Sequence, residues 1–151
     1  MSAEPKRLGE ILLEKKMITQ EQLAQAIELQ KLSGDIFGEI LIQKKWVSEI
    51  QILQALSDQF KIPFVRLDAN TVDWVTAKQF PMNLLSKNSC FPVKQDSQSM
   101  TVAVYDPLDA WTASALEAQS RGRTIHLVLA TKQDIKTAIQ ELGRRKLNEK
   151  T

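Results

Sequence analysis

Residues 7–30 read RLGEILLEKKMITQEQLAQAIELQ, and residues 36–59 read IFGEILIQKKWVSEIQILQALSDQ. With an offset of 29 residues, ten of the 24 aligned positions are identical, where roughly one or two would match by chance at average residue usage. The identical positions include Gly9 with Gly38 and Gln30 with Gln59. The sequence therefore predicts two copies of one supersecondary unit side by side.

Each copy is predicted to be a helix, a short turn and a second helix. Apolar residues recur at helical spacing on both sides of the turn. Thr19 followed by Gln22, and Ser48 followed by Gln51, fit the capping box that starts a helix. Residues 1–60 are therefore expected to form a tandem helix-turn-helix repeat, with motif copies at residues 7–30 and 36–59.

Beyond residue 60 the pattern becomes an alternation of strands and helices. We expect strands at residues 62–67, 90–94, 100–105 and 124–129, and helices at 71–80, 106–120 and from a cap at Thr131 to about Leu142. This order is typical of an α/β arrangement. The predicted fold class is α+β: an N-terminal tandem helical-hairpin subdomain followed by a small α/β subdomain at residues 61–143, with residues 144–151 as a tail or linker.

Length and composition indicate an ordinary globular protein. The 151 residues suit one domain or two small subdomains, and no apolar run approaches the ~18 residues that a membrane span needs. The first six residues lack the apolar core of a signal peptide, and a single cysteine, Cys90, suits a reducing compartment. We expect a cytoplasmic protein without direct membrane insertion.

The charge distribution argues against nucleic-acid binding. Residues 1–60 carry seven Lys/Arg and nine Asp/Glu, a net charge of −2, and residues 61–151 carry thirteen and nine, a net charge of +4. A nucleic-acid binder normally has a stronger basic excess. The helix expected at residues 20–30, which would be the recognition helix of a DNA-binding pair, contains no Lys or Arg. We expect no nucleic-acid partner.

Enzyme motifs are missing from the sequence. It contains no phosphate-binding Gly-rich loop and no Cys-x-x-Cys pair. The single histidine, His126, falls in a predicted strand, and Cys90 has no neighbouring base to activate it. We therefore expect no catalytic residue, no metal site and no cofactor.

The repeat places like residues in like positions, which suits a ligand. Gly9 and Gly38 lie in the first turn of a helix, where glycine costs about 0.5–1 kcal/mol unless a close approach requires it. Gln30 and Gln59 offer a donor and an acceptor side by side, as needed to read a nucleobase edge, and the Arg7 guanidinium suits a phosphate or the acceptor edge of guanine. The alternative is that the repeated residues only pack two hairpins together.

The two-copy pattern resembles the MshE-type N-terminal (MshEN) domain of type II secretion and type IV pilus assembly ATPases, which is also found on some glycosyltransferases. That family is marked by a tandem motif that begins with Arg-Leu-Gly, continues through aliphatic pairs and spaced leucines, and ends in glutamine, with five residues between the copies. Here the first copy runs from Arg7 to Gln30, and residues 31–35 supply the gap. Residues 62–65 and 106–109 also look like the family, so the resemblance spans almost the whole chain.

The resemblance implies binding of cyclic di-GMP, with each motif copy holding one half of this two-fold ligand. It implies polar contacts and an underlying surface at these residues: Arg7, Gln30, Gln59 and Asp106 for the polar contacts, and Leu8, Gly9, Leu23, Ile27, Gly38, Ile52 and Leu56 beneath the bases. The chain departs from the family pattern where Ile36 replaces the second arginine, and where Lys16 and Lys45 stand in place of the usual glycine.

Two functional hypotheses follow. The first is a non-enzymatic cyclic di-GMP sensor and regulatory module of a secretion, pilus or exopolysaccharide system, attached to or partnered with an ATPase or glycosyltransferase. The second is a protein–protein docking domain of a secretion or pilus ATPase that does not bind the nucleotide, which the missing second arginine favours.

Overall fold

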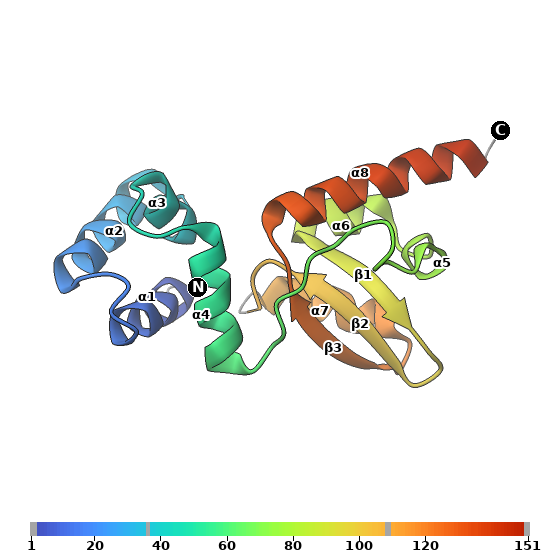
Figure 1. The fold of residues 1–151 in the computed structure, drawn as a ribbon, viewed down its shortest axis with the longest axis horizontal. Helices are drawn as coiled ribbons and strands as arrows, with labels where there is room; N and C mark the ends of the chain where they lie inside the picture. The colour runs from blue at the N-terminus through green and yellow to red at the C-terminus, as the bar shows by residue number, and fades with distance from the viewer. Residues whose placement is uncertain (1–2, 36, 108–109, 150–151) are drawn as a thin grey trace. The chain divides into compact units, whose positions relative to one another are not determined.

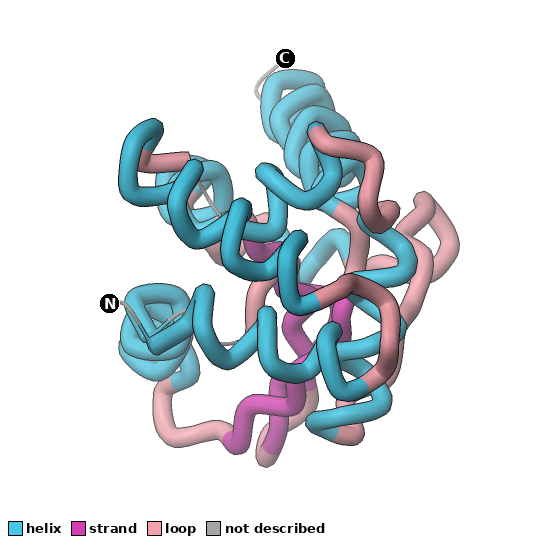
Figure 2. The backbone as a smooth tube through the Cα atoms, turned by 90° about the vertical axis from the view of Figure 1, so that its left-hand side faces the viewer, coloured by secondary structure: helices cyan, strands magenta, loops and turns pink. Residues whose placement is uncertain are grey.

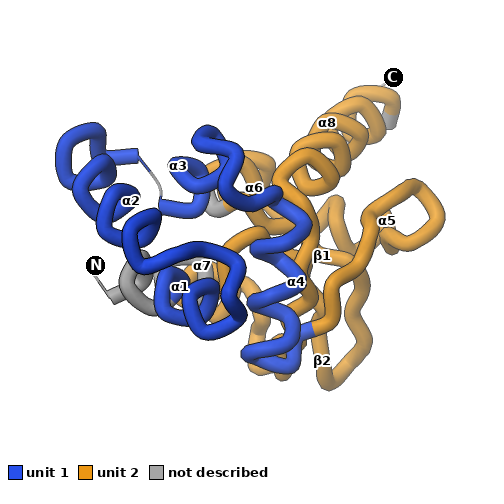
Figure 3. Tube along the Cα trace, turned by 60° about the vertical axis from the view of Figure 1, so that its left-hand side comes forward, with its two compact units in different colours: residues 1–62 blue, residues 63–151 orange. Residues whose placement is uncertain are grey.

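The chain divides into two compact units. The computed structural model describes residues 3–35, 37–107 and 110–149. The first unit is Met1–Ile62 and the second is Pro63–Thr151, coloured separately in Figure 3. Within the described residues, eight helices and one three-stranded sheet are present, and Figure 2 distinguishes them by colour. This confirms the α+β class expected from the sequence.

The first unit is entirely helical in its described part. Its elements are α1 (Ala3–Glu14), α2 (Gln20–Ser33), α3 (Phe37–Gln43) and α4 (Glu49–Phe60) (Figure 1). Both predicted capping boxes are present. The Gln22 backbone N–H donates to Thr19 Oγ1 and the Gln51 N–H donates to Ser48 Oγ, each at 3.1 Å, and the glutamine side chains accept from the cap N–H groups. The first helix of each copy is therefore followed by a second helix with the same start.

The turns between paired helices are also alike. Lys16 and Lys45 have φ angles of 62° and 63°, in the left-handed region that favours glycine. In the first turn the Met17 N–H donates to the Leu12 carbonyl, and in the second the Trp46 N–H donates to the Leu41 carbonyl. This is the Schellman arrangement that closes a helix C-terminus. It explains structurally why glycine suits these two positions.

The core of the first unit is apolar and draws on all four helices. Its buried side chains are Ile11, Leu12, Ile18, Ala26, Phe37, Ile40, Leu41, Val47, Ile52, Leu53, Ala55 and Leu56. At about 0.8 kcal/mol for each buried CH₂ group, this apolar burial is the main stabilising contribution to the bundle. An exposed ion pair between Lys15 and Asp58, with a nitrogen–oxygen distance of 3.8 Å, adds little to it.

The second unit is built on a small mixed sheet. Its elements are α5 (Trp74–Ala77), α6 (Met82–Asn88), β1 (Cys90–Gln95), β2 (Ser99–Val104), α7 (Ala110–Ser120), β3 (Thr124–Leu129) and α8 (Lys132–Glu149). The strand order is β1-β2-β3, with β1 antiparallel to β2 and β2 parallel to β3. Since α7 connects the parallel pair, the unit contains one βαβ crossover (Figure 1).

The strand expected at residues 62–67 is reduced to one bridge. Phe64 pairs with Leu129 beside β3, and the Val65 N–H donates to the Leu129 carbonyl at 2.8 Å. The chain then leaves the sheet because the Leu67 N–H and the Arg66 guanidinium both donate to the Asp134 carboxylate. The hydrogen bond from Arg66, reinforced by the one from Leu67, lowers the pKa of Asp134. A side-chain contact from α8 thus replaces strand pairing.

The helix expected at residues 71–80 is shorter, and one helix was not predicted. Asp68 Oδ1 accepts from the N–H groups of Asn70 and Thr71 and forms a turn, so α5 begins only after a cap at Asp73. Pro81 then precedes α6, whose seven residues lie in a stretch to which the sequence assigned no element. Short helices such as these carry too few turns to show a clear period in the sequence.

The last helix extends beyond its expected end near Leu142 and reaches Glu149. Glu141 accepts hydrogen bonds from Arg144 and Arg145, and Arg145 also lies over the Trp74 ring at 4.2 Å from its centroid. Lys146 Nζ donates to the Phe80 carbonyl at 2.9 Å. Because these contacts bind the end of α8 to the rest of the second unit, Gly143 does not end the helix.

Candidate functional site

The two repeat glycines face matching neighbours. A Cβ atom added to Gly9 would lie 2.4 Å from Leu23 Cδ1 and 3.3 Å from Phe37 Cζ. One added to Gly38 would lie 3.8 Å from Ile52 Cδ1 and 3.7 Å from Leu8 Cδ2. Each glycine thus faces the second helix of its own copy and the residue that precedes the glycine of the other copy. The neighbours differ by the same offset of 29 residues as the sequence repeat, so α1 and α3 exchange equivalent contacts.

The apolar candidate residues differ in exposure between the copies. Leu8, Leu23 and Ile27 are half-buried, whereas Ile52 and Leu56 are only 5% and 4% exposed. The first copy therefore presents part of its aliphatic face to solvent, and the second copy keeps the equivalent face in the core of the unit. A flat ligand resting on the repeat would meet Leu23 and Ile27 more readily than Ile52 and Leu56.

The two glutamines are also used differently. Gln30, at the end of α2, donates from Nε2 to the Asp35 carbonyl at 3.3 Å and thereby bridges the loop that leads towards α3. Gln59, near the end of α4, is exposed and makes no hydrogen bond through its side chain to any described residue. Its amide is therefore open to an external partner. The sequence pattern, which pairs the two glutamines as equivalents, does not reveal this difference.

The remaining polar candidates are Arg7 and Asp106. Arg7 belongs to α1, and its side chain lies outside the described residues, as does Ile36 at the equivalent position of the second copy. Asp106 follows β2 in the second unit, where it is half-buried. The structure brings Leu8, Gly9, Leu23, Gly38 and Ile52 together in the first unit.

Phe37 is a contact residue that was absent from the sequence-based set. It is 2% exposed, and its ring lies against the backbone of Gly9. The repeat itself contains the signal, because Phe37 aligns with Leu8, which was in the set.

The described residues contain no cluster of metal-ligating side chains. Within them, no group of three or more His, Cys, Asp or Glu side chains is placed to hold a metal ion. Cys90 is buried and forms no disulfide, and His126 is an exposed residue of β3. In the same part of the chain, no helix combines the length and apolar character required to cross a bilayer.

Comparison with known proteins identifies relatives along the chain. A family model described as MshEN domain matches residues 60–149, which is mainly the second unit. The type IV pilus assembly ATPase PilB of Myxococcus xanthus (strain DK1622) is 29% identical over 134 residues, or 89% of this chain. Since that coverage leaves out only about a tenth of the chain, the similarity extends into the helical repeat. The chain spans only 24% of the length of PilB.

Solved structures share the fold. The structure described as "Structure of MshE with cdg" has a TM-score of 0.81 and 25% sequence identity, and the match covers 89% of this chain and 97% of that one. The N-terminal domain of XpsE has a TM-score of 0.68 at 19% identity, with coverage of 89% and 92%. The XpsE match supports the fold alone.

Proposed function

This chain belongs to the MshEN domain family, and we propose that it is a non-enzymatic regulatory module that binds cyclic di-GMP on its tandem helical repeat. The observation that carries the proposal is the exchange of equivalent contacts around Gly9 and Gly38. A pair of helical hairpins arranged in this way offers two half-sites built from equivalent residues, and cyclic di-GMP consists of two matching halves. The similarity to the MshE structure with cdg, at a TM-score of 0.81, supports the same ligand.

The chemistry of the candidate residues suits guanine. A glutamine amide presents a donor and an acceptor to a base edge, and arginine donates two parallel hydrogen bonds to the O6 and N7 acceptors of guanine. An aspartate accepts from the guanine N1–H and N2–H₂ donors. We assign these roles to Gln30 and Gln59, to Arg7, and to Asp106. The half-buried Leu23 and Ile27 supply apolar surface beneath a base.

Regulation by such a ligand requires two arrangements of the protein with different affinities. A ligand that contacts both copies favours the arrangement in which the half-sites match its own geometry. By similarity to PilB, we propose that the signal passes to an ATPase of a secretion or pilus system, attached to this module or bound by it. This role places the module in the cytoplasm.

The direct test is isothermal titration calorimetry of the folded chain with cyclic di-GMP. We expect saturable binding with a Kd below about 100 µM. Arg7→Ala should weaken binding at least about tenfold, the loss of one charge-assisted hydrogen bond, with nearly unchanged thermal stability. Lys44→Ala, which removes an exposed cation from the same unit, is the matched control and should leave the Kd unchanged. Absence of heat from a folded sample would refute the proposal.

The second copy allows a gain-of-function test. Ile36 stands where the family pattern has its second arginine. Ile36→Arg should therefore strengthen binding by about 10- to 150-fold, since a hydrogen bond to a charged group contributes about 1.5–3 kcal/mol. If the Kd does not decrease, the proposal that the motif arginine contacts the ligand is wrong for both copies.

The isoleucine that this chain has at residue 36, in place of the second motif arginine, favours a second candidate function. This candidate is a docking domain that keeps the fold but does not bind the nucleotide. This candidate would be selected if titration with cyclic di-GMP releases no heat and the chain still binds a purified secretion or pilus ATPase without the nucleotide. The two functions are therefore separated by one pair of measurements.

A further inference from the structure

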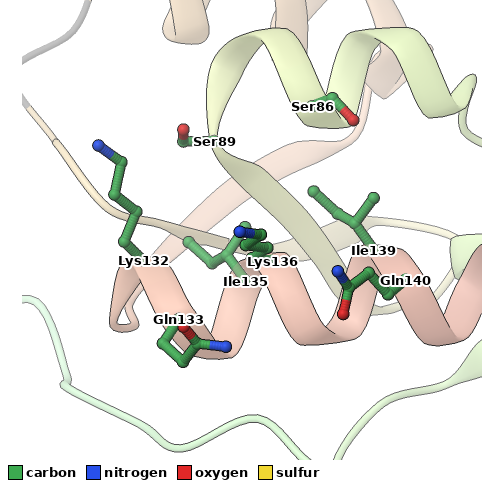
Figure 4. Close-up of a pocket in the computed structure, with 8 residues that line it drawn as sticks. All are labelled: Ser86, Ser89, Lys132, Gln133, Ile135, Lys136, Ile139 and Gln140. Carbon is green, nitrogen blue, oxygen red and sulfur yellow. The ribbon is translucent and has the colours of Figure 1, made fainter.

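The sheet of the second unit has two edge strands, and β1 is the protected one. Its register with β2 is irregular between Pro92 and Lys94, and proline, lysine and such irregularities all discourage the pairing of a further strand. The outer edge of β1 is also occupied, because the Asp73 N–H donates to the Val93 carbonyl at 2.7 Å. In addition, α6 and α8 pack on this strand, with a groove between the two helices (Figure 4). β1 is therefore protected against an added strand.

The strand at the other edge, β3, has none of these features (Figure 1). It pairs with β2 in an unbroken parallel register from Thr124 to Leu129. Its six residues include no proline, lysine, arginine or acidic residue, and Thr124, Ile125 and Val128 are β-branched, as favoured in strands. Among the described residues, only Phe64 pairs with its outer side, at Leu129. An edge strand of this kind is a template for pairing with another chain.

The backbone of Ile125 and Leu127 offers hydrogen-bonding groups on the outer edge of β3. The Leu129 N–H points outward and donates to the Pro63 carbonyl at 2.7 Å, whereas the Ala130 N–H points inward and donates to β2. Because these directions alternate along a strand, the N–H and C=O groups of residues 125 and 127 also point outward. They have no hydrogen-bond partner there among the described residues. Two donors and two acceptors are thus open to an extended chain.

The side chains of β3 indicate which sequence would fit. Half-buried Ile125 and Leu127 lie on one face of the strand, and exposed His126 lies on the other. Across the sheet, His126 is next to half-buried Thr101, which in turn is next to exposed Lys94. This row contains hydrogen-bond donors and a cation but no carboxylate. An acidic side chain therefore suits the place beside His126, and aliphatic side chains suit the places beside Ile125 and Leu127.

A second copy of this chain fits the edge less well. In an antiparallel pair of β3 strands with a two-fold axis at His126, residue 123 of one copy would face Leu129 of the other. Phe64 and Val65 already lie beside Leu129. The two imidazole rings would also face each other without an acidic partner. Residues 61–151 carry a net charge of +4, which likewise favours an acidic partner over a second copy.

We propose that the outer edge of β3 binds an extended segment of a partner protein as an added antiparallel strand, and that this segment has an aliphatic–acidic–aliphatic sequence. Its two aliphatic residues lie opposite Ile125 and Leu127 and exchange backbone hydrogen bonds with them, and its acidic residue lies opposite His126. Antiparallel pairing is expected because it is slightly more stable per residue than parallel pairing. The edge belongs to the second unit, and the proposal does not depend on cyclic di-GMP binding by the repeat.

The experiment is an NMR titration of the ¹⁵N-labelled 151-residue chain with the peptide acetyl-Ser-Val-Glu-Val-Ser-amide. We expect amide shifts concentrated at residues 124–128 and saturation below about 1 mM. A peptide N-methylated at both valines should not bind, because the valine N–H groups donate to β3. A peptide N-methylated at the glutamate should bind within about threefold of the parent, because that N–H group points away from β3.

A charge variant tests the contact at His126. His126→Glu places a carboxylate opposite the glutamate of the peptide and should raise the Kd about threefold or more. Replacing the peptide glutamate with lysine should restore binding to this variant. Gln140→Glu introduces the same carboxylate at an exposed position of α8 and should change the Kd less than about twofold.

Four results would overturn the proposal. The first is the absence of shifts in β3 at about 1 mM peptide, and the second is equal binding of the peptide N-methylated at both valines. The third is an equal effect of His126→Glu and Gln140→Glu on the Kd. The fourth is a chain that sediments as a dimer without peptide and is dissociated by His126→Glu, because a second copy would then cover the edge.

Discussion

A Cβ atom on Gly9, in the first copy of the repeat, would lie 2.4 Å from Leu23 Cδ1, whereas a Cβ atom on Gly38, in the second copy, would lie 3.8 Å from Ile52 Cδ1. The first distance is far below ordinary carbon–carbon contact, and the second is within it. The two glycines are identical in sequence and face equivalent neighbours, but only at Gly9 would an added methyl group force a neighbour, the Leu23 side chain, to move. Gly38 has space for a methyl group.

The copies are more alike in their turns than in their faces. The capping boxes of Thr19 and Ser48 have the same hydrogen-bond lengths, and Lys16 and Lys45 have φ angles within one degree of each other. The difference teaches that local backbone signals are preserved between the copies, while side-chain surroundings have diverged. A glycine at which the packing leaves room for a methyl group, such as Gly38, is a stronger candidate for contact with a ligand than one at which a methyl group would displace a neighbour.

The largest expected effect is on stability: alanine at Gly9 and alanine at Gly38 should change the free energy of unfolding in opposite directions. Gly9→Ala forces the Leu23 side chain to move and brings the new methyl group within 3.3 Å of buried Phe37, so it should lower the free energy of unfolding by about 1–2 kcal/mol, the overpacking cost less the helix-propensity gain. Gly38→Ala should raise it by about 0.5–1 kcal/mol, because alanine favours the helix and meets only ordinary contacts. Urea denaturation of both variants measures the difference.

Ligand binding provides a second comparison between Gly9 and Gly38. If Gly38 is retained for contact with cyclic di-GMP, Gly38→Ala should raise the Kd for cyclic di-GMP measured by calorimetry, although the folded variant is more stable. A Gly38→Ala protein that binds as tightly as the parent would assign this glycine no role at the ligand. Loss of stability in Gly38→Ala equal to that in Gly9→Ala would contradict the structural difference between the copies.

The capping boxes should respond equally. Thr19→Ala and Ser48→Ala each remove the side-chain acceptor for an N–H at 3.1 Å, and each should destabilise the chain by about 1 kcal/mol. Thermal unfolding followed by circular dichroism provides the comparison, with Ser97→Ala in the exposed β1–β2 turn as a control. A difference between the two cap variants larger than about 0.5 kcal/mol would show that the copies have diverged here as well.

The fold could be predicted from sequence wherever the signal is local. The capping boxes at Thr19 and Ser48, the strand Thr124–Leu129 and the cap at Thr131 were all expected and are present. The failures occur where distant contacts decide. Asp134 draws residues 66 and 67 away from the sheet, and Trp74 with Phe80 anchors the end of α8. Neither contact can be read from the spacing of apolar residues along one segment.

The candidate site was predictable only to the level of the repeat. The offset of 29 residues places Gly9, Gly38, Gln30 and Gln59 in equivalent positions, and it would also have identified Phe37 as the partner of Leu8. The sequence gives no measure of how closely two helices approach, so it does not distinguish a glycine held by packing from one with free space. Nor does it indicate that Gln30 bonds to a backbone carbonyl of its own loop.

A smaller effect is expected at the left-handed lysines. Lys16→Gly and Lys45→Gly relieve the steric cost of a side chain at φ near 62° and should each raise the free energy of unfolding by about 0.5–1 kcal/mol. Glycine at Lys44, which precedes the left-handed position, is the control and should destabilise instead. Equal responses at residues 16 and 45 are expected in urea denaturation, because the two turns have the same hydrogen bonds.

The smallest effect on stability concerns the two glutamines. Gln30→Ala removes an exposed hydrogen bond of 3.3 Å and should destabilise the chain by about 0.5 kcal/mol or less, whereas Gln59→Ala removes no bond to a described residue and should leave stability unchanged. The order of the two variants should reverse when the affinity for cyclic di-GMP is measured instead of stability. Gln30 must release the Asp35 carbonyl before its amide can contact a base, so part of the gain from that contact is offset. In calorimetry, Gln59→Ala should therefore weaken the binding of cyclic di-GMP more than Gln30→Ala does. The opposite order would mean that the first copy holds the ligand without rearranging its loop.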